Sequence, residues 1–171
     1  MAEPRSRPGE GIWAVSACLA GRACRYDGRS GDGDALRARL AALEAAGARL
    51  VAVCPEELGG LGTPRPAAGL SGGDGHDVLA GRARVLRNHD GLDVTAAYVA
   101  GAAAALAQAE AACAGVDDEI GAPRRALLKA RSPSCGAATT WIDGAVRPGD
   151  GVFAARLRAA GWQVASDEDP R

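Results

Sequence analysis

The sequence predicts a single α/β domain built as a three-layer, Rossmann-like open sheet that is mostly parallel. Two observations support this fold class. Short apolar segments alternate with helical segments along the chain, which is the pattern of parallel strands joined by crossover helices. The length of 171 residues and the hydrophobic content of 47% suit one domain with a substantial core. We therefore expect one globular unit over residues 11–168, preceded by a disordered tail over residues 1–10.

The apolar segments are expected to form the strands. They lie at residues 11–19, 48–54, 82–88, 124–130 and 162–166. The second of them stops abruptly at Cys54, because Pro55 follows. Two connections are rich in glycine and are expected to be loops, over residues 20–34 and 63–81. The second of these loops is long enough to suggest a function.

Three segments are expected to be helices. The first covers residues 35–47, with Asp34 as its N-cap, an apolar face formed by Leu36, Leu40 and Leu43, and Gly47 at its end. The second begins at a cap formed by Asp93 or Thr95 and runs to about Cys113. The third covers residues 150–161 and ends at Gly161.

Charge and composition argue against several classes of partner. The net charge of −1 gives no electrostatic basis for binding nucleic acid or an anionic membrane. The most apolar run, residues 94–113, is mostly alanine and contains Gln108 and Glu110, so we do not expect a membrane span. No secretory signal is visible at the start of the chain, and a cytoplasmic protein is the expectation. An odd number of cysteines, five, then favours metal-binding or catalytic thiols over disulfides.

Three cysteines come at, or a few residues beyond, the carboxyl ends of expected strands. They are Cys18, Cys54 and Cys135. Ligands of open α/β sheets bind in the crevice outside those strand ends, so three thiols distant in sequence are expected to meet there. Cys24 could reach the same crevice from its loop, whereas Cys113 is expected to be a small core residue.

Such thiols suit a soft metal, and their spacing favours one kind of centre. Zinc sites usually contain closely spaced cysteine pairs with two to four intervening residues, and this chain has none. Single, scattered cysteines fit an iron–sulfur cluster better. Three ligands would leave one iron open to a substrate, whereas Cys24 as a fourth ligand would close the cluster for electron transfer or structure. His76 and His89 are expected to be solvated loop residues rather than ligands.

The basic residues are unusually distributed. Lys129 is the only lysine among 20 basic residues, and it lies six positions before Cys135. The arginine excess resembles a nucleotide-level bias, which lowers the weight of any single arginine. Lys129 could offset the charge of an anionic cluster or bond the following loop, or it could be an ordinary solvated lysine at a strand end.

Five motifs occur in order over most of the chain: "SACLAGRACRYDG", "VCPEELGGLGTPRP", "GLDVTAAYVAGA", "LLKARSPSCG" and "GDGVFAARLRAAGWQV". Together they resemble a bacterial domain-of-unknown-function family that includes the thiouracil desulfidases. The resemblance implies a 4Fe–4S cluster held by Cys18, Cys54 and Cys135, whose open iron takes up the thiocarbonyl sulfur of a thiolated pyrimidine. It further implies Glu56 as a general acid/base, and Ser132 or Ser134 for positioning substrate or water.

This chain departs from the family pattern at two places. Gly69 stands where many members have a glutamate, and Trp141 and Ile142 stand where many have a tyrosine. The leading hypothesis is an iron–sulfur desulfidase acting on a small thiolated nucleobase, without nucleic acid or membrane partners, as a monomer or homodimer. The alternatives are a non-enzymatic cluster carrier or sensor that uses Cys24, and a binding domain whose glycine-rich loops at residues 28–34 and 69–75 hold an anion.

Overall fold

The computed structural model describes residues 11–114 and 123–170, and within these residues the strands form two four-stranded sheets. The predicted tail over residues 1–10 lies outside this part of the chain. Sheet A is parallel throughout and has the spatial order β2 (Ala48–Val53), β1 (Gly11–Ser16), β5 (Arg125–Leu128) and β8 (Gln163–Ser166). Sheet B is mixed and has the order β4 (Arg84–Arg87), β3 (Ala68–Ser71), β6 (Thr139–Ile142) and β7 (Ala145–Pro148). The predicted α/β class with a mostly parallel sheet is confirmed, and sheet B was not predicted.

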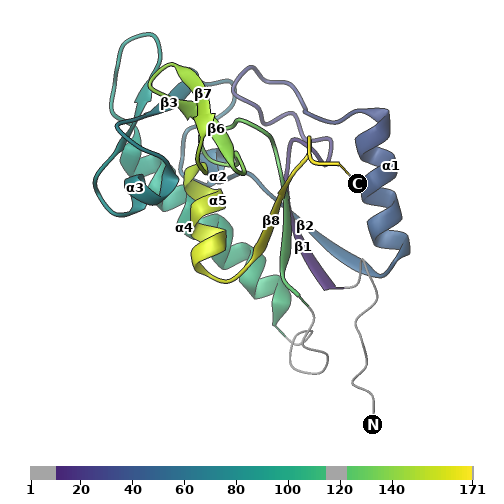
Figure 1. Cartoon of the computed structure of the whole chain (residues 1–171). Helices are drawn as coiled ribbons and strands as arrows, with labels where there is room; N and C mark the ends of the chain where they lie inside the picture. The colour runs from purple at the N-terminus through teal and green to yellow at the C-terminus, as the bar shows by residue number, and fades with distance from the viewer. Residues whose placement is uncertain (1–10, 115–122, 171) are drawn as a thin grey trace.

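Helices cover both faces of sheet A and create the three layers (Figure 1). On one face lies α1 (Asp34–Ala45), whose three predicted leucines pack with residues of β1 and β5 such as Val15 and Leu127. On the other face lie α4 (Thr95–Cys113) and α5 (Val152–Ala159), which share a second core cluster with the opposite sides of the same strands. Because strand side chains alternate between faces, one short strand can serve both cores.

The helix α4 is long and apolar enough to meet the length and composition test for a membrane span. In the structure it packs against α2, α5 and sheet A instead, with a buried stripe formed by Tyr98, Gly101, Ala102, Ala105, Ala109 and Cys113. A buried stripe of this kind is typical of a core helix.

Close packing on α4 fixes the segment that follows β2. The short helix α2 (Pro55–Leu58) crosses α4 at Gly101, where an added Cβ would lie 1.9 Å from the carbonyl oxygen of Pro55. Only a glycine permits this approach. The position of Cys54 and Glu56 is therefore set by backbone-to-backbone contact between two helices.

Several local expectations were wrong. The segment at residues 63–81 is not one loop, because it contains β3 and the helix α3 (Gly75–Leu79), which Asp74 and Asp77 stabilise as a capping box. The β6–β7 hairpin was also missed. Its turn is an Asp143-Gly144 pair with positive φ at both residues, which is the preferred chemistry for a two-residue hairpin.

The expected helix caps also need correction. The helix α1 has Gly33 at its N-cap position, with Asp34 as its first residue, and α4 has Val94 there. Asp93 still accepts a hydrogen bond from the backbone N–H of Thr95 at 2.9 Å. The prediction for α4 was therefore right about the stabilising side chain and wrong by one residue about the cap.

Candidate active site

A cavity of about 410 Å³ opens at the carboxyl ends of sheet A. The strands β2 and β5 lie on either side of β1, and ligand sites of parallel sheets form at such points, where the strand order reverses. Residues of sheet B and of the segments beside its strands form another part of the cavity wall. The cavity is lined by every residue to which the sequence analysis gave a site role: Cys18, Cys24, Cys54, Glu56, Lys129, Ser132, Ser134 and Cys135. Their placement in one cavity is observed, and their individual roles stay predictions.

The turn that carries Cys135 is organised by Ser132. The Ser132 hydroxyl oxygen accepts hydrogen bonds from the backbone N–H groups of Ser134 and Cys135, at 3.3 and 3.1 Å. The turn closes on Gly136, where a Cβ would lie 2.5 Å from the carbonyl oxygen of Thr139. Serine and glycine in "SPSCG" therefore have a backbone role, which fixes the direction of the Cys135 thiol.

The four cavity thiols are all buried, and the surroundings of Cys24, Cys54 and Cys135 favour the protonated form. Burial raises the pKa of Cys135 to about 12. A hydrogen bond with Cys18 raises the pKa of Cys24 to about 11, against an opposing bond with Cys54. Cys24 and burial likewise raise the pKa of Cys54. Such thiols are inert as free groups, and a metal centre that binds them must displace their protons.

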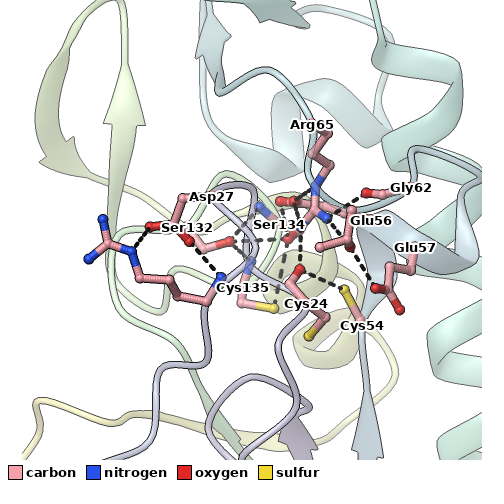
Figure 2. A network of polar contacts seen from close by, with 12 residues as sticks. Cys24, Asp27, Cys54, Glu56, Glu57, Gly62, Arg65, Ser132, Ser134 and Cys135 are labelled. Atoms are coloured by element: carbon pink, nitrogen blue, oxygen red, sulfur yellow. Dashed lines mark hydrogen bonds and ion pairs between the residues drawn. The ribbon is translucent and has the colours of Figure 1, made fainter.

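The donor set fits an iron–sulfur cluster better than a single metal ion. Among residues 11–114 and 123–170, no three His, Cys, Asp or Glu side chains are close enough together to hold one ion. A polynuclear cluster binds its ligand sulfurs at separate irons, so it requires thiols that surround a cavity without converging on one point. Figure 2 shows the sulfurs of Cys24, Cys54 and Cys135 gathered on one side of the polar network that contains Glu56.

Glu56 is held on both carboxylate oxygens. Its Oε1 accepts a hydrogen bond from the Ser134 hydroxyl at 3.0 Å, and its Oε2 accepts one from Nε of Arg65 at 2.6 Å (Figure 2). Arg65 also donates to the carbonyl oxygens of Cys24, at 2.9 Å, and Gly62, at 2.8 Å. The guanidinium thereby joins the candidate catalytic carboxylate to the loop that carries Cys24.

Arg65 and Glu56 form a buried ion pair. Their side chains are only 5% and 9% exposed. Burial acts to lower the pKa of Arg65, but the Glu56 carboxylate outweighs it and the net shift is upward. Nearby Tyr98 is also buried, and burial together with the charge of Glu56 raises the pKa of its phenol. The fully paired, water-poor setting holds Glu56 in one orientation.

Lys129 lies beside the cysteines but is bound to an acidic partner. Its Nζ is 3.3 Å from Oδ2 of Asp167, and its side chain is 23% exposed. Its Cδ and the sulfur of Cys18 both flank Gly31, at 3.4 and 3.5 Å from the position that a Cβ would take there. Lys129 is therefore placed to act on the charge near Cys18, with Asp167 already balancing part of its own charge.

The chain is similar to proteins of a known family. A family model described as 2-thiouracil desulfurase matches residues 13–169. The chain belongs to the 2-thiouracil desulfurase family. The resemblance noted from the five motifs is thereby confirmed.

Two relatives of this desulfurase-family chain extend the comparison. YbbK of Bacillus subtilis (strain 168), described as an uncharacterized protein, is 39% identical over 158 residues, covering 91% of this chain and 95% of that one. A solved structure described as the [4Fe-4S]-dependent thiouracil desulfidase TudS (DUF523) is similar at a TM-score of 0.68 and 39% identity. The match covers 93% of this chain and 91% of that chain.

The two histidines and Cys113 of this desulfurase-family chain are not among the residues that line the cavity. His76 bonds the buried Asp150 at 3.0 Å, and His89 is exposed beside Asp90 at 3.4 Å. Neither lines the cavity. Cys113 is buried in α4 and donates to the carbonyl oxygen of Ala109, as expected for a core cysteine.

Several polar residues that line the cavity were not predicted from the sequence, among them Arg65, Tyr98 and Asn88. Arg65 had a usable signal, because a cation between Pro64 and Pro66 occupies a rigid segment. Its weight was lowered by the abundance of arginine. Tyr98 and Asn88 carried no signal that distinguishes them from ordinary helix and loop residues.

Proposed function

We propose that this chain is an iron–sulfur-dependent desulfidase that replaces the thiocarbonyl sulfur of a thiolated pyrimidine, such as 2-thiouracil, with oxygen. The overall change is hydrolytic: one water oxygen replaces the sulfur, and the sulfur leaves as sulfide with no net redox change in the substrate. The proposal places the enzyme in the cytoplasm, as a monomer or homodimer acting on a small thiolated nucleobase, without nucleic acid or a membrane.

One observation carries this proposal. Glu56 and Ser134 are hydrogen-bonded at 3.0 Å in the cavity that Cys18, Cys54 and Cys135 also line. Glu56 accepts the proton of the attacking water, and Ser134 orients that water or the developing oxyanion. Ser132 supports both through the turn that it caps and through its 3.1 Å contact with the Ser134 hydroxyl.

Cys18, Cys54 and Cys135 are the proposed ligands of a 4Fe–4S cluster. When bound by three thiolates, such a cluster supplies a soft Lewis acid for the departing sulfur. Lys129 offsets part of the negative charge that builds up beside Cys18. Arg65 keeps the carboxylate of Glu56 directed toward Ser134.

The test uses anaerobically purified, cluster-loaded protein and measures sulfide release from 2-thiouracil. We expect Glu56→Gln to lower kcat by roughly 10²–10⁴-fold with iron content unchanged, which is the usual effect of losing a general base. Glu57→Gln is the matched control, because Glu57 is the next residue but bonds Arg22 and Thr63. Full activity of Glu56→Gln would reject its role, and no sulfide release from any thiolated pyrimidine by loaded wild type would reject the function.

A second candidate function follows from Cys24. Its thiol is 2% exposed, lines the same cavity, and is hydrogen-bonded with Cys18 and Cys54. As a fourth ligand it would make the protein a cluster carrier or sensor without a catalytic iron. Iron content separates the two: Cys24→Ala keeps its cluster if three cysteines are the ligands and loses it if four are, whereas Cys135→Ala loses it in both cases.

A further inference from the structure

One part of the cavity wall comes from sheet B and the segments beside its strands. Figure 1 shows sheet B beside the carboxyl ends of sheet A. From this sheet and its edges the cavity takes Ala67 and Ala68 at the start of β3, Asn88 after β4, and Trp141 on β6. This wall contains no acid, base or thiol among its cavity-lining residues in the described part of the chain. It is therefore suited to binding a substrate rather than to chemistry.

Strand geometry presents Trp141 to the cavity. Along β6, Thr140 and Ile142 are buried and Trp141 between them is 46% exposed, as the two-residue alternation of a strand requires. Trp141 is thus excluded from the core but still lines the cavity. A planar aromatic face at a cavity mouth is a stacking surface for a planar heterocycle.

Asn88 lies next to Trp141 on the same wall. A Cβ at Gly69 would be 3.5 Å from Oδ1 of Asn88 and 3.9 Å from Cβ of Trp141, so the amide oxygen of Asn88 and the base of the Trp141 side chain flank the same glycine. The backbone N–H of Asn88 donates to the carbonyl oxygen of Ala67 at 2.9 Å, which anchors the residue to β3. Both departures from the family pattern noted above, Gly69 and Trp141, therefore lie close together, and of the two Trp141 lines the cavity.

The chemistry of an asparagine amide suits one edge of a thiouracil. The amide offers one acceptor and two donors in a plane. The N3–H and the adjacent C4 carbonyl of 2-thiouracil form a donor–acceptor pair on one edge of the ring. In 4-thiouracil the N3–H again adjoins a carbonyl, which is then at C2. Asparagine reads base edges in this bidentate way.

We propose that Trp141 and Asn88 form the substrate-recognition subsite, with the indole stacked on the pyrimidine ring and the amide bonded to its N3–H and adjacent carbonyl. This inference rests on the proposed desulfidase function. It assigns recognition to sheet B and chemistry to the ends of sheet A. It also defines the substrate class as planar thiolated heterocycles with an unsubstituted N–H beside a carbonyl.

The experiment compares 2-thiouracil with its N3-methyl derivative, using loaded protein and measuring kcat, KM and iron content. Wild type is expected to prefer 2-thiouracil by about tenfold or more in kcat/KM, since a site built for an N–H rejects its absence. Asn88→Ala should lose this preference, with a reduced kcat/KM for 2-thiouracil and no further loss for the methylated substrate. Trp141→Ala should lower kcat/KM about tenfold for both substrates, and Trp141→Phe should restore most of it.

His89→Ala is the matched control, because His89 adjoins Asn88 but does not line the cavity. It should behave as wild type. An equal loss for both substrates in Asn88→Ala, or unchanged kinetics in Trp141→Ala, would overturn the subsite while leaving the desulfidase function intact.

A binding measurement tests the subsite even if no sulfide is released and the proposed desulfidase function is rejected. Calorimetric titration with uracil should show binding to wild type that weakens about tenfold in Trp141→Ala and in Asn88→Ala. Absence of binding to wild type, or equal binding to all three proteins, would overturn the subsite independently of catalysis.

Discussion

Two of the cations that line the cavity, Arg65 and Lys129, differ sharply in how they are held. Arg65 is 5% exposed, and it bonds Glu56, Cys24 and Gly62. Lys129 is 23% exposed and its ammonium bonds Asp167. The lysine is unique in composition, whereas the arginine is one of nineteen. The cation that is rare in the sequence, Lys129, is therefore the less constrained of the two.

The difference indicates that two properties decide how much unfolding free energy is lost when an ion pair is broken. They are the burial of the pair and the number of groups that the charge is hydrogen-bonded to. A buried pair whose partner is removed leaves a desolvated charge, whereas an exposed partner is taken up by water. The structure contains such pairs at several degrees of burial. Three substitutions of decreasing expected effect test the ranking.

The largest effect is expected for Arg65→Met. This substitution leaves the Glu56 carboxylate buried beside Ser134 without its cation, which typically costs about 3–5 kcal/mol of unfolding free energy. Denaturant unfolding of anaerobically purified protein, followed by circular dichroism, measures the loss. Arg22→Met is the control, because Arg22 forms a similar pair with Glu57 but is 56% exposed.

A double variant tests the cause of that loss. Arg65→Met combined with Glu56→Gln removes both charges and should be more stable than Arg65→Met alone. If Arg65→Met is no less stable than Arg22→Met, burial does not govern these pairs and the comparison fails.

The contrast between Arg65 and Lys129 also bears on which parts of the molecule could be predicted from its sequence. Parallel strands followed by Cys18, Cys54 and Cys135 were predictable. Apolar segments are a local signal, and the topology of α/β folds follows general rules. The leucine face of α1 followed from the same periodic signal. The fold class and the shared cavity could thus be obtained without coordinates.

Two kinds of feature could not be obtained in this way. The Glu56–Arg65 pair depends on how the loop before β3 folds back over α2, which no local pattern encodes. The strand β4 lies in the predicted segment 82–88, but sheet B as a second sheet was missed. Its strands have four residues each, β3 was expected to be part of a loop, and β6 and β7 were not predicted. The Asp143-Gly144 turn was visible and could have indicated the β6–β7 hairpin.

An intermediate effect is expected for Asp150→Asn. The Asp150 side chain is 9% exposed and receives bonds from Ala138 N–H at 2.8 Å, Arg158 at 2.8 Å and His76 at 3.0 Å. Burial acts to raise the pKa of this carboxyl, but these donors outweigh it and hold the pKa below the ordinary value of 3.8. Loss of the charged acceptor should cost about 1–3 kcal/mol at pH 7.

The pH dependence of that effect follows from the sign of the shift. A depressed folded-state pKa contributes stability that is present above pH 3.8 and lost as the pH falls through the lower folded-state value. The difference in unfolding free energy between wild type and Asp150→Asn should therefore shrink below pH 3.8. Asp34→Asn, at a fully exposed carboxylate, is the control for the substitution itself. A difference that stays constant down to acid unfolding would contradict the assignment.

The smallest effect is expected for Lys129→Met. Asp167 keeps its 2.7 Å hydrogen bond from the backbone N–H of Ala130, so it does not become an unpaired group when the ammonium is removed. The partly exposed pair should contribute about 1 kcal/mol or less to the unfolding free energy, measured in the same titrations.

Any further role of Lys129 must then appear in the metal centre. An iron content lower in Lys129→Met than in Lys129→Arg would show that the positive charge beside Cys18 supports the cluster. Full iron content and activity in both variants would leave Lys129 as an ordinary strand-end lysine, and a stability loss as large as that of Arg65→Met would overturn the ranking by burial.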